Sequence, residues 1–250
     1  KGVSKYKLPS SAYIAVALGL TVALAIQVAA HSSRFSWMAL LLVLFPASGV
    51  AIGLWNALLL PLQQPAFLPK LEYRGGIPHE AATLVVVPTL LTDPPGARKM
   101  VGQLEVHYLA NPQENLYFCL LGDFKDSQHR REEGDREILT AAQKAIEELN
   151  SKYGQGRFFV LMRQRSLSQT QQRWLGWERK RGALVELNAL LSGVGITSFI
   201  KPPPLPKVAY ILTLDVDTRL PLGMARRLVG AISHPLNRVD VKGGKVTRGY

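Results

Sequence analysis

Acidic residues are absent from the first sixty positions of this chain, although the whole sequence contains 18 Asp and Glu. Formal charge of either sign is also absent from residues 8–33 and 35–69. Each uncharged run can supply the ~20 apolar residues that cross a bilayer. We therefore predict two transmembrane helices, at about residues 11–30 and 37–60. A single buried hairpin in a soluble core is the alternative, and two such runs in succession disfavour it.

Signal-peptide features are missing as well, since there is no initiating Met and no small-residue cleavage motif, and a second span follows at once. Only Arg34 carries charge in the connection, whereas basic residues flank both outer ends. The positive-inside bias then places both ends in the cytoplasm, with the remaining domain facing an anionic lipid bilayer surface. The flanking basic residues are Lys1, Lys5, Lys7, Lys70, Arg74, Arg98 and Lys99.

Cysteine is nearly absent: the single Cys119 excludes a disulfide framework and suits a reducing compartment. His79, His129 and His234 have no metal-ligand spacing among themselves or with Cys119, which disfavours a zinc site. His107 lies among apolar residues, as a partnered core histidine would. Walker, Gly-x-Ser-x-Gly and Gly-x-Gly-x-x-Gly motifs are lacking after every predicted strand. The net charge of +12 could indicate binding to nucleic acid. Aromatic residues do not interleave with the basic residues, however, so we expect no nucleic-acid partner.

An alternation of strands and helices is expected after the membrane segments. A Pro- and Gly-rich linker is expected at residues 63–82, and then a domain over 83–250 that looks incomplete at its C-terminus. Continuous apolar runs predict buried strands, and helical periodicity between them predicts a parallel α/β sheet of Rossmann-like type. The expected strands are 83–88, 115–122, 157–162 and 208–214, and the expected helices are 93–108, 138–154, 177–191 and 222–232.

An Asp-x-Asp motif ends the last of these strands. Asp215 and Asp217 project the same way from an extended segment, at the sheet edge where ligands of open α/β sheets bind. Two hard oxygen ligands suit Mg²⁺ or Mn²⁺ completed by waters and substrate phosphates. The alternative is a solvated turn without a metal, and the motif alone does not decide between them.

Other polar residues follow the same strand ends and should converge on one crevice. They include Thr89, Asp123, Asp126 and the segment from Arg163 to Arg165. A nucleoside diphosphate needs a metal ion on its phosphates, a carboxylate on its base or ribose, and a guanidinium that neutralises the remaining charge. This convergence favours a nucleotide-sugar site.

A basic run precedes the third helix of the domain. Arg179, Lys180 and Arg181 stand at a helix N-terminus, itself an anion site, on a helix that also carries Asn188. The alternatives are a solvated helix cap or a patch for acidic lipid. Trp174 and Trp177, three residues apart, could form a platform for a sugar face, although packing is the commoner role for such a pair.

Several blocks in order resemble the glycosyltransferase domain of cyclic β-1,2-glucan synthases. They are Leu-Val-Val-Val-Pro-Thr-Leu-Leu at 84–91, Leu-Glu-Val-His-Tyr-Leu-Ala-Asn-Pro at 104–112, Gly-Trp-Glu-Arg-Lys-Arg-Gly at 176–182, Leu-Asp-Val-Asp-Thr-Arg-Leu-Pro at 214–221, and Ala-Arg-Arg-Leu-Val-Gly with His-Pro-Leu-Asn-Arg at 225–238. The resemblance covers about residues 68–250. It implies a GT-A-like fold, a multi-pass bacterial inner-membrane protein, UDP-glucose as donor, a glucan acceptor and a divalent metal.

The resemblance also assigns roles: Asp123 to uridine, and Asp215 with Asp217 to the metal and diphosphate. It implies further transmembrane and phosphorylase-like domains in the parent protein, and a general base beyond Tyr250, so the catalytic residue is unknown and the fragment is expected to be inactive alone. One departure is Ala183, where the family is expected to carry Lys; Lys180 or Arg181 would then hold the phosphate. The alternatives are another processive synthase, of cellulose, chitin or hyaluronan type, and an inactive membrane-anchored glycan- or lipid-binding module.

Overall fold

A computed structural model describes residues 9–31, 37–62 and 68–248 of the 250-residue chain. The chain divides into two compact units, Lys1–Leu68 and Pro69–Tyr250. The charges Lys1, Lys5, Lys7 and Arg34 lie outside the described residues, as do residues 63–67 of the predicted linker and the last two residues.

The first unit is a pair of long apolar helices, α1 (Ser10–Ala30) and α2 (Trp37–Leu59), followed by the short 3-10 helix η1 (Leu60–Leu62). Small side chains are buried where the two helices meet, as is usual for helices that pack closely in lipid: Ala25, Ala29, Ala47 and Ala51. Large apolar side chains such as Leu18 and Phe45 point outward. Both helices are long and apolar enough to cross a membrane.

The second unit is built on a four-stranded parallel sheet in the order β3-β2-β1-β6. The strands are β1 (Thr83–Leu91), β2 (Leu116–Phe124), β3 (Phe158–Met162) and β6 (Tyr210–Thr213). Every residue of β1 from Thr83 to Val87 is buried, which explains the unbroken apolar run in the sequence. The fold class predicted from the sequence, a parallel α/β sheet after two apolar helices, is confirmed.

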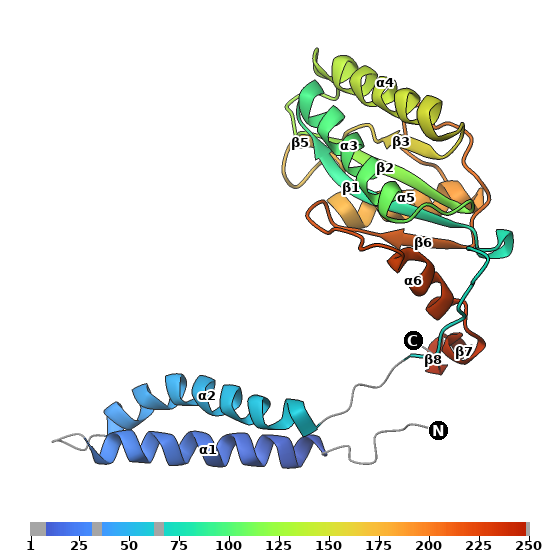
Figure 1. Ribbon diagram of the computed structural model, residues 1–250. Helices are drawn as coiled ribbons and strands as arrows, with labels where there is room; N and C mark the ends of the chain where they lie inside the picture. Colours follow the sequence, from blue (N-terminus) through green and yellow to red (C-terminus); the bar gives the residue numbers. More distant parts are fainter. Residues whose placement is uncertain (1–8, 32–36, 63–67, 249–250) are drawn as a thin grey trace. The chain divides into compact units, whose positions relative to one another are not determined.

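Helices cover both faces of this sheet (Figure 1). On one face Val85, Val87 and the residues alternating with them in β2 and β3 pack against α3 (Pro94–Ala110), α4 (Asp135–Tyr153) and α6 (Met224–Ile232). On the other face Leu84 and Val86 pack against α5 (Arg179–Ser192). The two-residue period of a strand therefore divides one apolar run between two cores.

Smaller elements complete the unit: the 3-10 helices η2 (His79–Ala81) and η3 (Pro235–Asn237), and two antiparallel hairpins. The first hairpin pairs β4 (Ser166–Ser168) with β5 (Arg173–Leu175), and the second pairs β7 (Asp240–Lys242) with β8 (Lys245–Arg248). The first hairpin was not predicted from the sequence. The helix predicted at 177–191 begins two residues later than expected, because Trp177 and Glu178 belong to the turn that precedes α5.

Candidate functional site

The register of the sheet brings four strand ends to one edge. Asp123 on β2 lies opposite Leu90 on β1, and Thr89 lies opposite Gly122. The backbone N–H of Arg163 donates to the carbonyl of Gly122 at 3.0 Å, which places Arg163 beside Asp123. On the other side of β1, Asp215 leaves β6 one residue after the amide of Leu214 donates to Val86. The predicted convergence of these strand ends therefore exists in the fold.

A cavity of about 180 Å³ lies at this edge. Four residues of its lining belong to the predicted site: Thr89, Asp123, Arg179 and Lys180. Its apolar wall consists of Pro88, Leu90 and Leu121. A mixed wall of this kind, with a few convergent polar groups, is typical of small-molecule sites.

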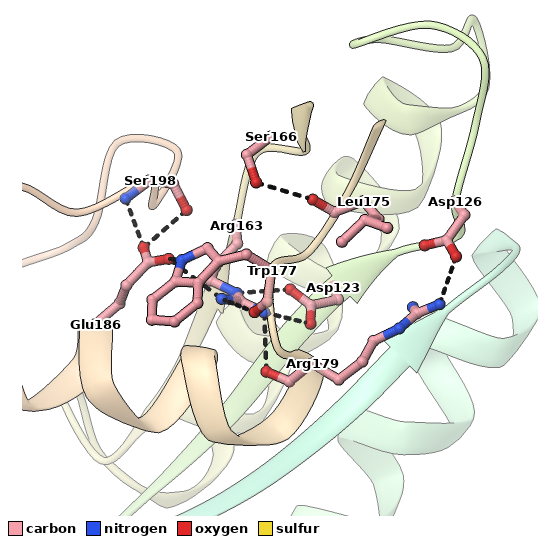
Figure 2. Close-up of polar contacts among 9 residues, drawn as sticks. All are labelled: Asp123, Asp126, Arg163, Ser166, Leu175, Trp177, Arg179, Glu186 and Ser198. Atoms are coloured by element: carbon pink, nitrogen blue, oxygen red, sulfur yellow. Dashed lines mark hydrogen bonds and ion pairs between the residues drawn. The ribbon is translucent and has the colours of Figure 1, made fainter. Parts of the chain in front are cut away.

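Asp123 is not a free carboxylate, because Arg163 holds both of its oxygens (Figure 2). Nε of Arg163 donates to Oδ1 and Nη2 donates to Oδ2, each at 2.7 Å, the bidentate geometry that makes such pairs strong. The Arg163 side chain is 1% exposed. Burial alone would lower the pKa of Arg163, but Asp123 and Glu186 outweigh it, so the pKa lies above its ordinary value.

Glu186 lies on the far side of the same guanidinium. Its Oε1 accepts from Arg163 Nη1 at 3.2 Å and from Trp177 Nε1 at 2.5 Å, while Oε2 accepts from the amide and the hydroxyl of Ser198. Burial acts to raise the pKa of this carboxyl group. The hydrogen bonds from Ser198 and Trp177 and the charge of Arg163 overcome that effect and lower the pKa below its ordinary value.

The basic run is presented by a tight turn. Glu178 and Arg179 both have positive φ, 45° and 46°, a conformation that costs a non-glycine residue about 1–2 kcal/mol. Arg163 stabilises this turn by donating from Nη1 to the carbonyl of Trp177 and from Nη2 to the carbonyl of Arg179. Arg179 and Lys180 therefore reach the cavity because a buried arginine fixes the backbone that carries them.

The basic side chains have different partners. Arg179 donates to Asp126 at 2.6 Å, and Lys180 contacts Asp215. Arg181 pairs with Glu178 at the surface, where such a pair contributes little. The other oxygen of Asp126, Oδ1, is buried without a hydrogen-bond partner among the described residues, and Asp126 lines a second cavity of about 380 Å³.

The Asp-x-Asp carboxylates are exposed, in a turn closed by the amide of Thr218 donating to the carbonyl of Asp215. Among the described residues, no group of three or more His, Cys, Asp or Glu side chains could hold a metal ion. Two hard carboxylates nevertheless fit Mg²⁺ or Mn²⁺ that takes its remaining ligands from water and phosphate. Asp215 forms an ion pair with Lys180, which lines the cavity.

Seven predicted site residues are not in the lining of the 180 Å³ cavity: Asp126, Trp174, Trp177, Arg181, Asn188, Asp215 and Asp217. Trp174 and Trp177 line a separate cavity of about 550 Å³ together with Arg130, whose guanidinium lies 5.9 Å from the ring centroid of Trp174. Asn188 is exposed on α5 and is not in the lining of the first cavity. The binding roles of these residues remain predictions.

Arg163 was predicted to lie at the site, but its pairing with Asp123 was not, and Glu186 was not predicted at all. Arg163 follows a strand of five fully buried residues, a position where a charged side chain must find a partner. Glu186 interrupts the buried face of α5 between Ala183 and Leu187. An acid within an apolar helix stripe was the available signal for Glu186.

His107 is a core residue, as predicted: it is buried and its Nδ1 accepts from the amide of Leu220 at 3.4 Å. Burial lowers its pKa. Neighbouring Asn111 donates to the carbonyl of Pro221 and accepts from the amide of Ala225, so the end of α3 fixes the loop that follows Asp217.

The fold and the edge cavity define a class: a Rossmann-like α/β domain with a partly polar cavity at the carboxyl edge of a parallel sheet, the edge where ligands of such sheets bind. Comparison with known proteins adds a specific relative. The chain is 43% identical over 218 residues, 84% of its length, to the cyclic beta-(1,2)-glucan synthase NdvB of Rhizobium meliloti strain 1021. The aligned segment spans 8% of the length of that relative. The resemblance inferred from the sequence blocks is thereby confirmed, and no family model matches the chain.

Proposed function

We propose that this chain is the donor-binding part of a membrane-bound inverting glycosyltransferase that transfers glucose from UDP-glucose to a growing β-1,2-glucan. The observation that carries the proposal is the cavity at the sheet edge, where Asp123, Arg179 and Lys180 converge and Lys180 reaches Asp215. The likeness to a glucan synthase supports the choice of substrate. The two apolar helices support placement in a bacterial inner membrane, with the α/β unit on the cytoplasmic side where nucleotide sugars are found.

The roles of the residues follow from their chemistry. Asp123, fixed by Arg163, offers acceptor oxygens to the uracil ring, and Asp126 with its unpartnered Oδ1 offers one to a ribose hydroxyl. Arg179 and Lys180 neutralise the diphosphate. Asp215 and Asp217 would hold Mg²⁺ or Mn²⁺, which when bound supplies stabilisation of the charge on the departing UDP. Glucosyl transfer would proceed by attack of an acceptor hydroxyl on C1 of the glucose, assisted by a general base that lies outside residues 1–250.

A substitution in the Asp-x-Asp motif tests the proposal. We expect Asp217→Asn to weaken Mn²⁺-dependent binding of UDP-glucose at least tenfold, about 1.4 kcal/mol, because one charged ligand is lost. The matched control is Asp240→Asn, an exposed aspartate on β7, which should leave binding unchanged. Isothermal titration calorimetry of the detergent-solubilised chain measures both. Equal, undiminished binding by Asp217→Asn would exclude the metal role.

The rival enzyme is a processive synthase of cellulose, chitin or hyaluronan type, and competition between UDP-glucose and UDP-N-acetylglucosamine for the same chain separates the donors. Preference for the N-acetylated donor would contradict the proposal. The non-enzyme rival, a glycan- or lipid-binding module, predicts no nucleotide binding at all.

A further inference from the structure

The carboxylate of Glu186 makes no hydrogen bond to a residue that lines the 180 Å³ cavity, yet both of its oxygens are hydrogen-bonded. Each of its oxygens accepts two hydrogen bonds, from Arg163 and Trp177 on one and from Ser198 on the other. The side chain is 6% exposed. Burying a carboxylate is costly unless it is paired. We therefore ask which charged group Glu186 neutralises.

That group is the guanidinium of Arg163, whose five N–H donors have five acceptors. Two are the oxygens of Asp123, two are the carbonyls of Trp177 and Arg179, and the fifth is Glu186 (Figure 2). A guanidinium with every donor used cannot rotate without losing hydrogen bonds. Glu186 therefore fixes the guanidinium through Nη1, and the guanidinium fixes Asp123 through Nε and Nη2.

Two glycines pack closely against the network. A Cβ on Gly176 would lie 2.7 Å from both oxygens of Asp123, and one on Gly182 would lie 3.0 Å from Arg163 Nη1. Each oxygen of Asp123 receives one hydrogen bond from Arg163, which leaves acceptor capacity on both, and Asp123 lines the 180 Å³ cavity. The network therefore offers a ligand an ionised acceptor in a fixed direction.

We propose that Glu186 is a positioning residue that sets nucleobase selectivity by holding Arg163, and through it Asp123, in the orientation that accepts a ring N–H. The inference rests on the proposed function, in which Asp123 faces the base. A fixed carboxylate that only accepts favours bases with an imide N–H, such as uracil, and rejects cytosine, whose N3 is itself an acceptor. Two acceptors facing each other leave both unpaired, which is the strongest basis for discrimination in a polar site.

The test compares the affinities for UDP and CDP, each with Mg²⁺, measured by calorimetry on the detergent-solubilised chain. We expect the wild type to favour UDP at least tenfold. Glu186→Gln removes the charge behind Arg163 and should weaken UDP about tenfold while changing CDP less than twofold, so the selectivity ratio falls. Glu148→Gln, at an exposed position of α4, is the matched control and should leave both affinities unchanged.

Two further variants keep the result decisive. Ser198→Ala removes one hydrogen bond from Glu186 without touching Arg163 and should lower the ratio two- to threefold, even if Glu186→Gln fails to fold. In an Asp123→Asn background, Glu186→Gln should have no further effect on UDP binding, since both act on the same contact.

The outcomes separate the hypotheses. If Glu186 has only a structural role, Glu186→Gln should lower the affinities for UDP and CDP by the same factor. That result, which leaves the UDP/CDP affinity ratio unchanged, would overturn the positioning role. Failure of the wild-type chain to bind UDP would overturn the proposed function itself, and the positioning role with it.

Discussion

Gly182 on α5 has no room for a side chain. A Cβ there would lie 2.1 Å from the carbonyl oxygen of Trp177, a contact that the backbone cannot relieve without moving the turn that carries Arg179 and Lys180. We expect Gly182→Ala to lower the free energy of unfolding by about 1–3 kcal/mol, the usual range for overpacking. It should also abolish the preference for UDP.

Gly102 on α3 provides the contrast, because a Cβ there meets nothing within 4 Å. Replacing this helical glycine with alanine should stabilise the unit by about 0.5–1 kcal/mol, since glycine is the poorer helix former. Denaturant unfolding followed by circular dichroism measures both variants. A loss of stability at Gly102 equal to that at Gly182 would show that packing around α5 is not special.

Single residues also show how far the sequence alone can lead. Asp215 and Asp217 could be found because an apolar strand followed by Asp-x-Asp is a local pattern. Arg163 and Glu186 could not be paired from the sequence, because the contacts that define them join residues 40 and 23 positions apart. Local patterns locate the charged groups, and only the sheet register decides which of them neutralise each other.

At the scale of elements, the end of α3 supports the loop after Asp217 through a neutral histidine. Burial lowers the pKa of His107, so the unfolded chain takes up a proton near pH 6.5 while the folded chain does not. Stability should therefore fall as the pH drops below about 6.5, by at most about 1.4 kcal/mol per pH unit. Above that pH His107 contributes no pH dependence to stability.

Two variants isolate this effect in thermal unfolding between pH 7.5 and 5. His107→Gln keeps an acceptor for the amide of Leu220 and cannot titrate, so its stability should change less with pH than that of the wild type. His129→Gln, at an exposed position, should retain the wild-type slope. A wild-type slope in His107→Gln would mean that another group titrates.

Elements differ in how well their sequence predicts them. The strands β1, β2 and β3 could be predicted because burial on both faces requires unbroken apolar runs, whereas β6 is half-buried and was found from its short apolar run alone. The β4–β5 hairpin could not, since each of its strands has three residues and mixed burial, and it depends on partners elsewhere, such as the pairing of Ser127 with Trp174. Short strands without alternation carry no periodic signal.

For the molecule as a whole, the basic residues that follow the second helix, among them Lys70 and Arg74, predict that the α/β unit lies on the cytoplasmic side of a membrane. His31, at the end of α1, is then expected on the opposite side. The chain suits mapping by cysteine labelling, because its one native thiol should not react with a maleimide. Cys119 is buried in the sheet, and burial raises its pKa to about 12.

Two single-cysteine additions test the orientation. In intact spheroplasts, a membrane-impermeant maleimide should label His31→Cys and leave Gln169→Cys unmodified, since Gln169 is exposed on the α/β unit. In inverted membrane vesicles the pattern should reverse, and the wild-type chain should stay unlabelled in both. Labelling of Gln169→Cys from outside would put the cavity at the carboxyl edge of the sheet away from cytoplasmic nucleotide sugars, and the proposed donor would then be wrong.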